Sequence, residues 1–359
     1  MQRYTYGFLL NPATGTLVPA LNFASNPNQK LRWEEKTEYN IGLDFGIIGN
    51  KITGSVDYYN RTTNGLLYLF PVSPTSNLLP NTWANAGKIV NKGIELAVNA
   101  NIFQSKNFTW SSNFNIARNS NNVSSIRSDI NKDTSISFFL TGNTGEPIGL
   151  NTHKVEVGQP LGNFYGYQVT DITDKGEWVY SDKDGKPISA AQRTPDDRKI
   201  LGNGIPKVIL GFNNTIRYKN FDLSIYLRGA FGFQILNAPR MFYENRKTDK
   251  HRNVLKSSFD KVFGKAIISK TADPDYNSYY IEDGDYVKIN NLTIGYNFKF
   301  KGVNSARIYV AGTNLLTFTR YSGIDPEVDL YGNGLTPGID YRDRFPTTRG
   351  FTFGLNVNF

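Results

Sequence analysis

Apolar and polar residues alternate in nine segments of the chain, and a period of two predicts β-strands with one apolar and one polar face. In the last segment, five apolar residues are separated by single small or polar residues. These five are Phe351, Phe353, Leu355, Val357 and Phe359. Together the segments predict strands at 37–47, 52–59, 94–102, 108–116, 208–218, 221–227, 292–298, 306–310 and 351–359.

The connections between these segments alternate in length. Short turns fall near residues 49, 105, 219 and 302. Long excursions occupy residues 61–90, 119–205, 230–284 and 319–347. Outer-membrane barrels have short periplasmic turns and long extracellular loops, whereas a soluble sandwich has no reason to place every long loop at one end. The sequence therefore predicts an all-β, antiparallel transmembrane β-barrel, entered from outside at residue 37 and left on the periplasmic side.

Some segments do not fit the count of crossings and are assigned to the loops. Residues 1–36 contain three prolines and are predicted to be an extracellular loop segment. Residues 163–170 and 177–180 have strand-like composition, and we expect a hairpin within the second outer loop. Residues 253–267 predict a short helix, because four apolar residues lie at helical spacing. These residues are Leu255, Phe259, Val262 and Phe263.

Composition supports strands over helices. The chain has 24 Phe and 21 Tyr against 2 Met, with 33 Gly and 16 Pro. It has no run of the roughly 18 to 20 apolar residues that a membrane helix needs. Without cysteine, disulfides and thiolate chemistry are excluded, and the histidines are limited to His153 and His251. We expect no cofactor and no enzymatic activity.

The net charge of +9 raises nucleic acid as a partner. The basic residues are scattered through the predicted loops rather than clustered on one helix or stripe. This distribution favours a solvated surface that faces anionic lipid headgroups, and we expect no nucleic-acid binding.

Ten short motifs, in a fixed order over nearly the whole chain, resemble one family, the SusC/RagA-like TonB-linked outer-membrane transporters. They are Leu31–Glu34, Tyr39–Phe45, Gly54–Tyr59, Asn91–Leu96, Leu161–Tyr167, Tyr218–Ser224, Ile281–Tyr286, Asn291–Tyr296, Gly312–Leu316 and Tyr321–Glu327. The resemblance covers the C-terminal part of the barrel. It implies that residues 37–359 supply about nine strands of a larger barrel, and that the signal peptide and plug domain of such transporters are absent from this sequence.

The resemblance also implies function and partners. Members import glycans or oligopeptides in Gram-negative bacteria, with a SusD-like surface lipoprotein as a lid and with TonB acting through the N-terminal region that is missing here. An aromatic residue that closes an alternating strand is similar to the signal read by the barrel assembly machinery, which indicates Leu355, Val357 and Phe359. A passive porin or structural barrel without energy coupling is the alternative function.

Candidate site residues are few. Trp83 and Trp178 lie in predicted outer loops, where they could stack on sugar rings or pack the core of the loop itself. Asp182 and Asp184 resemble part of a calcium loop, but a third acidic ligand at loop spacing and a terminal Glu are lacking, so a solvated turn is the favoured interpretation. Trp110, close to a periplasmic turn, is typical of an interfacial aromatic girdle.

No catalytic constellation is apparent. Asp57 and Glu95 fall on the predicted lumen face, where acidic side chains beside an aqueous lumen are ordinary. The resemblance does not indicate which nutrient is carried, because the outer loops of such transporters diverge with substrate.

Overall fold

Nine strands form one continuous antiparallel sheet, which we call the wall. The computed structural model describes residues 4–12, 14–23, 26–72, 79–128, 137–248, 253–300, 302–328 and 334–358. Across the wall the strand order is β21-β19-β18-β15-β14-β6-β5-β4-β3. The strands are β3 (Glu35–Ile47), β4 (Ile52–Pro71), β5 (Asn81–Gln104), β6 (Phe108–Ser128), β14 (Val208–Tyr218), β15 (Phe221–Phe231), β18 (Tyr286–Phe300), β19 (Val303–Thr319) and β21 (Gly350–Asn358). Each of the nine segments predicted from alternation is a strand of this sheet.

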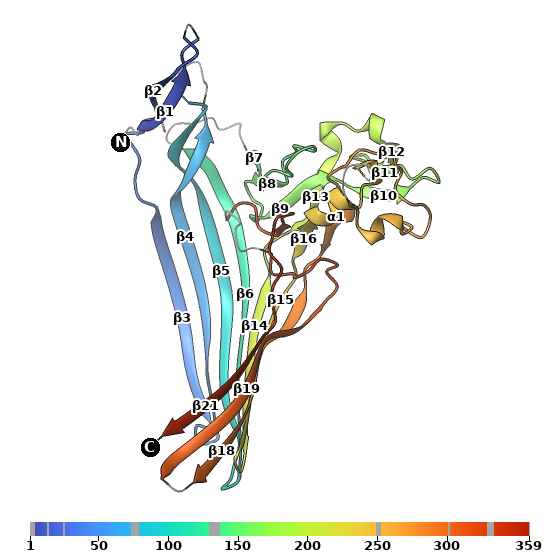
Figure 1. Cartoon of the computed structure of the whole chain (residues 1–359). Helices are drawn as coiled ribbons and strands as arrows, with labels where there is room; N and C mark the ends of the chain where they lie inside the picture. Colours follow the sequence, from blue (N-terminus) through green and yellow to red (C-terminus); the bar gives the residue numbers. More distant parts are fainter. Residues whose placement is uncertain are drawn as a thin grey trace.

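The wall is tall and curved, with short turns at one end and all larger excursions at the other (Figure 1). Within the described residues, β3 and β21 each pair on one side only, so the barrel is not closed. The antiparallel barrel class and the expected positions of the short turns are confirmed. Phe359 lies outside the described residues.

The register gives the wall one apolar and one polar face. Directly opposed residues of neighbouring strands point to the same side of a sheet, so they form rows across it. One apolar row is Leu43, Val56, Leu96, Ile116 and Leu210. The adjacent row on the other face is Asp44, Ser55, Ala97, Asn115 and Gly211. The apolar rows form the face that meets lipid.

Aromatic rings border the lipid face at the end of the short turns. Phe108 lies 5.6 Å from Phe103 and 6.4 Å from Tyr218, measured between ring centroids. Tyr296 lies 4.7 Å from Phe221 and 6.2 Å from Phe298. Such rings suit a membrane interface. Trp110 belongs to the next row toward the midplane, opposite Ile216, and its indole N–H donates to Asn214 Oδ1 at 3.1 Å.

Three strands are much longer than a membrane requires. A tilted strand crosses the bilayer in about 9–11 residues, but β4, β5 and β6 have 20, 24 and 21 residues. The expectation of an irregular excursion at 61–90 is therefore wrong, since β4 and β5 stay paired up to Pro71 and Asn81. The regular structure of β4 thus ends at Pro71 rather than near Arg61.

The start of the chain is also more regular than expected. Strands β1 (Tyr4–Leu10) and β2 (Leu17–Phe23) pair as a hairpin within the segment predicted as an extracellular loop, whose side of the membrane stays a prediction. The following residues lie along the extension of β4 and β5. Asn85 Nδ2 donates to the carbonyl of Arg32 at 2.8 Å, and Asn85 Oδ1 accepts from the Arg32 N–H at 2.7 Å.

The long connections after β6, β15 and β19 fold together into what we call the loop domain, made of the described residues of 137–205, 232–285 and 320–349 (Figure 1). It contains a four-stranded sheet and two three-stranded sheets, ordered β13-β9-β8-β7, β10-β11-β12 and β17-β16-β20. Their strands are β7 (Phe138–Thr141), β8 (His153–Glu156), β9 (Asn163–Tyr167), β10 (Val169–Ile172), β11 (Trp178–Ser181), β12 (Pro187–Ser189), β13 (Arg198–Asn203), β16 (Gln234–Asn237), β17 (Ile281–Asp283) and β20 (Ile339–Asp340).

Helical structure is limited to one short helix and several single turns within the described residues. Helix α1 (Ala238–Tyr243) begins after Asn237, whose Oδ1 accepts from the Arg240 N–H at 3.0 Å and caps the helix. The 3-10 turns are Ala190–Gln192, Pro195–Asp197, Arg246–Thr248, Lys256–Phe259 and Ser278–Tyr280. No helix in the part of the chain that the structure describes has the length and apolar character needed to cross a membrane.

Two sequence expectations within the loop domain need correction. The helix expected at 253–267 is wrong, because only the turn Lys256–Phe259 is helical and Val262 forms a β-bridge with Ala266. The expected hairpin within 163–180 exists as β10 and β11, but β9 belongs to a different sheet. Both errors arise because tertiary packing, rather than local periodicity, decides the conformation of these segments.

The two faces of the wall predict opposite responses to a buried charge. Leu96→Arg should destabilise the folded barrel by about 2–4 kcal/mol, because the new charge meets hydrocarbon. Asn99→Arg, three residues away on the polar face, should cost much less. Reversible unfolding in detergent or lipid measures both, and equal losses would contradict the assignment of the faces.

Candidate functional site

The polar face carries two adjacent rows of uncharged hydrogen-bonding side chains. One row is Thr53, Asn99, Asn113, Asn213, Tyr226, Asn291 and Thr313. The row nearer the short turns is Asn101, Ser111, Thr215, Ser224, Thr293, Ala311 and Thr352. Apart from Ala311, these residues offer amides or hydroxyls, which is the lining expected of an aqueous lumen. Asp57 and Glu95 oppose each other on the same face, as predicted.

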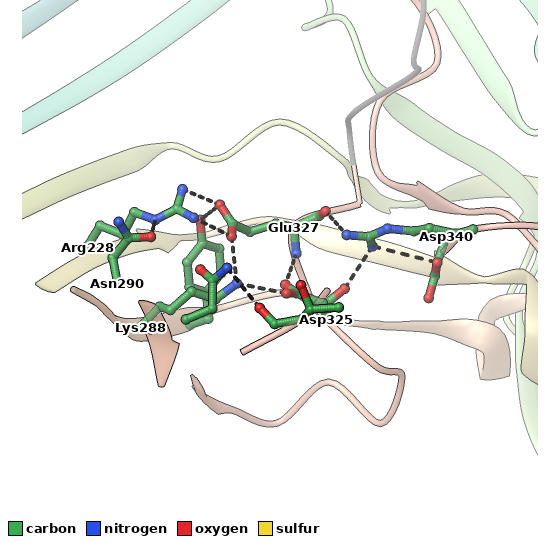
Figure 2. A network of polar contacts seen from close by, with 10 residues as sticks. Arg228, Lys288, Asn290, Asp325, Glu327 and Asp340 are labelled. Carbon is green, nitrogen blue, oxygen red and sulfur yellow. Dashed lines mark hydrogen bonds and ion pairs between the residues drawn. The ribbon is translucent and has the colours of Figure 1, made fainter. Parts of the chain in front are cut away.

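A cluster of charges attaches the loop domain to this face (Figure 2). Lys288 in β18 has a side chain that is 1% exposed, and its Nζ donates to Asp325 Oδ2 at 2.8 Å and to Glu327 Oε2 at 2.6 Å. Arg228 in β15 pairs with Glu327 and donates from Nε to Asn290 Oδ1 at 3.0 Å. We call Arg228, Lys288, Asp325 and Glu327 the anchor cluster. Because two of its members belong to the wall and two to the connection after β19, it fixes that connection over the lumen face.

A second set of contacts supports the acidic half of the cluster. Arg344 donates to the carbonyl oxygens of Asp325, at 3.0 Å, and Glu327, and its Nη1 lies 3.7 Å from Asp340 Oδ1. Tyr321 donates its hydroxyl to Asp340 Oδ2 at 2.6 Å. The acidic residues are thereby held in position from both sides.

The pKa of Asp325 follows from this environment. Burial raises the pKa, but hydrogen bonds donated by Lys288, Thr347 and the Glu327 N–H outweigh burial and hold the pKa of Asp325 below its ordinary value. The carboxylate is consequently charged at neutral pH and pairs with the buried ammonium.

Glu282 joins the connection after β19 to helix α1. Its Oε1 accepts from Asn237 Nδ2 at 2.9 Å and from Arg240 Nη1 at 2.7 Å. Its Oε2 accepts from the Ser322 N–H at 2.8 Å. Residues from β16, from β17 and from the β19–β21 connection therefore meet at one carboxylate.

Trp178 lies in the core of the loop domain. It is 6% exposed, and its ring centroid is 5.0 Å from that of Tyr279 and 6.2 Å from that of Tyr280. Trp178 also lines a cavity of about 820 Å³, together with Arg193 and Asp275. The structure places Trp178 mainly in packing, and its contact with a substrate stays a prediction.

Trp83 is placed differently from the expectation. It lies within β5 opposite Leu69, rather than in a loop, and is 48% exposed. Trp83 and Trp178 belong to separate parts of the structure, the extended strands and the loop-domain core. The sequence does not indicate this difference, because its pattern places both residues in long loops.

Asp182 forms a tight turn between β11 and β12. Its Oδ1 accepts from the N–H groups of Asp184 and Lys186 at 2.9 and 2.8 Å. Asp184 is exposed at the tip of the turn. Among the residues whose positions the structure gives, no group of three or more His, Asp or Glu side chains could hold a metal ion. The geometry at Asp182 is that of a side chain closing its own turn.

The residues of the expected assembly signal lie on the last strand. Leu355 is opposite Ile308 and Val357 is opposite Ala306, and Leu355 is 62% exposed on the lipid face. Phe359, the third residue of the expected signal, is outside the described residues. Recognition by the assembly machinery stays a prediction.

His153 is fully buried in β8, and its ring centroid lies 4.5 Å from that of Phe164, with the two rings tilted by 42°. Its Nε2 lies 3.0 Å from the carbonyl oxygen of Pro337, so Nε2 carries the proton and donates. Nδ1 then accepts from the Thr152 hydroxyl at 2.8 Å. Burial lowers the pKa of His153 to about 4, although the bond to Pro337 opposes this shift. The other histidine, His251, lies outside the described residues.

Sequence reasoning missed the anchor cluster. The motifs Ile281–Tyr286 and Tyr321–Glu327 contribute to the family resemblance, but no role follows from them in the sequence alone. The available signal was a lysine shortly before the predicted strand 292–298, together with two carboxylates flanking a proline in the next loop.

The sheet has one apolar face with an aromatic border, one polar face, and a folded set of loops at one end. These features define an integral outer-membrane β-barrel protein. A family model described as TonB dependent receptor-like, beta-barrel, matches residues 2–315. The chain belongs to this family of TonB-dependent receptors, whose barrels lie in the outer membrane.

Named relatives support the same family assignment. TonB-dependent receptor P3 of Formosa agariphila is 30% identical over 361 residues, which cover 92% of this chain and 35% of the relative. TonB-dependent receptor SusC of Bacteroides thetaiotaomicron is 29% identical over 350 residues, covering 92% of this chain and 32% of SusC. This chain thus spans about a third of the length of these curated relatives.

The fold also matches solved structures. The RagAB peptide importer in its "closed-closed" state aligns with a TM-score of 0.80 at 21% identity, over 99% of this chain and 38% of that chain. The structure of the RagAB peptide transporter gives a TM-score of 0.78 at 20% identity, over 99% of this chain and 38% of that chain. The SusC/RagA-like resemblance inferred from the motifs is confirmed.

Removing the buried cation should loosen the loop domain. Lys288→Met leaves Asp325, whose side chain is 6% exposed, without its cation, and such a loss costs about 3–5 kcal/mol. We expect faster hydrogen exchange and proteolysis of residues 320–328. Lys36→Met is the control, because its pair with Glu38 is exposed and worth at most about 1 kcal/mol. Unchanged protection in Lys288→Met would contradict the anchoring role.

Acid should weaken the packing around His153. The unfolded chain binds a proton with a pKa near 6.5, whereas the folded site does so only near pH 4. Stability of the loop domain should be flat above pH 6.5 and should fall between pH 6.5 and 4, by up to about 3 kcal/mol. Hydrogen exchange across this range measures the loss. His153→Gln should remove this part of the slope, and an identical slope in the variant would exclude His153 as its source.

Proposed function

We propose that this chain forms the C-terminal section of the barrel of an outer-membrane importer for oligomeric nutrients, either glycans or oligopeptides. The observation that carries the proposal is the anchor cluster, which holds a folded domain over a polar lumen face that has two rows of uncharged hydrogen-bonding side chains. A passive pore needs no such cover. Family membership supports import. The RagAB proteins are described as a transporter or importer of peptides, and that substrate is stated for those proteins only.

The same proposal assigns partners. A SusD-like lipoprotein would sit above the loop domain as a lid, and TonB would supply energy through segments other than the wall described here. Residues 1–36 would precede the first crossing on the extracellular side, and residues 37–359 would form the barrel part. The likeness to SusC and to RagAB supports these assignments.

We further propose that additional strands complete the barrel. Each backbone N–H or C=O group that is left unpaired in hydrocarbon costs several kcal/mol. The exposed edges of β3 and β21 therefore require partner strands. Direct pairing of these two edges would be parallel, because an odd number of antiparallel strands leaves the first and last in the same direction. Expressed alone behind a signal peptide, residues 1–359 should aggregate or be degraded. A stable, heat-modifiable and importing species would overturn this proposal.

Labelling in intact cells tests the orientation. Because the chain has no cysteine, single cysteines can be introduced without background. In the full-length protein, Asp184→Cys at the tip of the β11–β12 turn should react with a membrane-impermeant maleimide. Ser105→Cys, in the short turn between β5 and β6, should not react. Labelling of the second variant alone would invert the orientation.

Uptake by the same cells tests the energy requirement. Import of a radiolabelled oligopeptide or oligosaccharide mixture should stop when tonB is deleted. Uptake that continues at the same rate without TonB would favour a passive porin.

A further inference from the structure

Arg342 is a positively charged side chain held in a fixed position at the surface of the loop domain. Its guanidinium carbon lies 3.9 Å from the centroid of the Phe242 ring, and Nη1 donates to the carbonyl oxygen of Glu146 at 3.3 Å. Phe242 itself is 2% exposed and belongs to the core. The guanidinium thus rests on a rigid aromatic support while the residue stays exposed to solvent.

The backbone opposite Arg342 is shaped for this close approach. Gly145 has a φ of +79°, and a Cβ built there would lie 3.0 Å from Arg342 Nη2. A side chain at this position would be strained and would press on the guanidinium. The glycine therefore keeps one face of the site open and close to the charge.

Three arginines of the loop domain bind carboxylates of the protein. Arg193 pairs with Asp275 at 2.9 Å, Arg240 with Glu244 at 2.7 Å, and Arg344 with Asp340 at 3.7 Å. Arg342 has no such carboxylate partner among the described residues of the chain. Its charge is consequently available to an external anion.

Arg342 also stands between two grooves. One, of about 330 Å³, is lined in part by Ile324 and Phe345, which are 73% and 82% exposed. The other, of about 450 Å³, is lined in part by Tyr243 and Tyr341. Both grooves combine apolar surface with Arg342, which suits an oligomer that carries one negative group between apolar units. The other charges of the first groove are paired within the protein, Asp325 with Lys288, Asp340 with Arg344 and Arg240 with Glu244, while Asp343 also lines the second groove.

We propose that Arg342 is a recognition point for a carboxylate of the imported oligomer, and that the two grooves bind the units next to it. This inference rests on the proposed import function. A guanidinium fork matches a carboxylate in a bidentate pair, and its stacked position removes much of the entropy that binding would otherwise cost. The exposed Ile324 and Phe345 favour a peptide with a free C-terminus over a uronic-acid oligosaccharide as the source of the carboxylate.

Binding to the purified full-length protein tests the proposal. The probes are a tetrapeptide of alanine and leucine with a free C-terminus, the same peptide amidated, trigalacturonate, and its methyl ester. The wild type should bind the free-acid peptide more tightly than the amide by about tenfold, the effect of one charge-assisted pair. Arg342→Met should lose this preference and leave affinity for the amide unchanged.

Arg198→Met is the matched control. Arg198 also lies over an aromatic ring, that of Tyr165 at 5.3 Å, and donates to a backbone carbonyl, but it lines neither groove. The Arg198→Met variant should still bind the free-acid peptide more tightly than the amide. Arg342→Gln provides a second variant if Arg342→Met fails to give the heat-modifiable folded barrel.

The outcomes are distinct. No acid preference in the wild type, or a preference that survives in both Arg342 variants, overturns the proposal. An Arg342-dependent preference for trigalacturonate over its ester, without one for the peptide acid, supports the carboxylate site and reassigns its source. If import depends on TonB but peptide binding does not depend on Arg342, the role of Arg342 is refuted and the import function stands. If peptide binding depends on Arg342 but import does not depend on TonB, only the import function is refuted.

Discussion

Backbone hydrogen bonding in hydrocarbon is the constraint on which this structure depends. No water is available within the bilayer, so each N–H and C=O of a spanning strand needs a partner on a neighbouring strand. The nine strands meet this requirement through continuous antiparallel ladders from β3 to β21. The apolar rows, the aromatic border and the polar inner rows all follow from it, because a paired strand can only point its side chains alternately outward and inward.

The same ladders continue beyond the membrane in β4, β5 and β6, where water could satisfy the backbone. Side chains there fasten the neighbouring segment, as Asn85 does with Arg32. On the other part of the wall, strands β14 and β15 have 11 residues each and end near the membrane. The loop domain lies above these shorter strands, and the anchor cluster joins it to β15 and β18.

The sequence predicted the wall well because alternation is a local signal. Every strand contributes its own period of two, so the nine crossings and their short turns could be located without tertiary information. The upper half of β4 was missed because Thr62, Thr63 and Asn64 are followed by the apolar run Leu66–Leu69, which hides the period. The anchor cluster was missed for another reason. Lys288 and Asp325 are 37 residues apart in the chain, and only the path of the folded connection brings them into contact.

The separation between wall and loop domain has an evolutionary consequence. The main core of the loop domain is formed by its own residues, such as Phe164, Trp178 and Met241, while a small second cluster that includes Ala230, Phe233 and Tyr286 joins it to the wall. Mutations at the β10–β12 tip or in the grooves beside Arg342 can therefore accumulate without disturbing the ladders in the bilayer. Lineages that keep this joint can therefore vary the loop domain while the membrane-spanning wall stays unchanged.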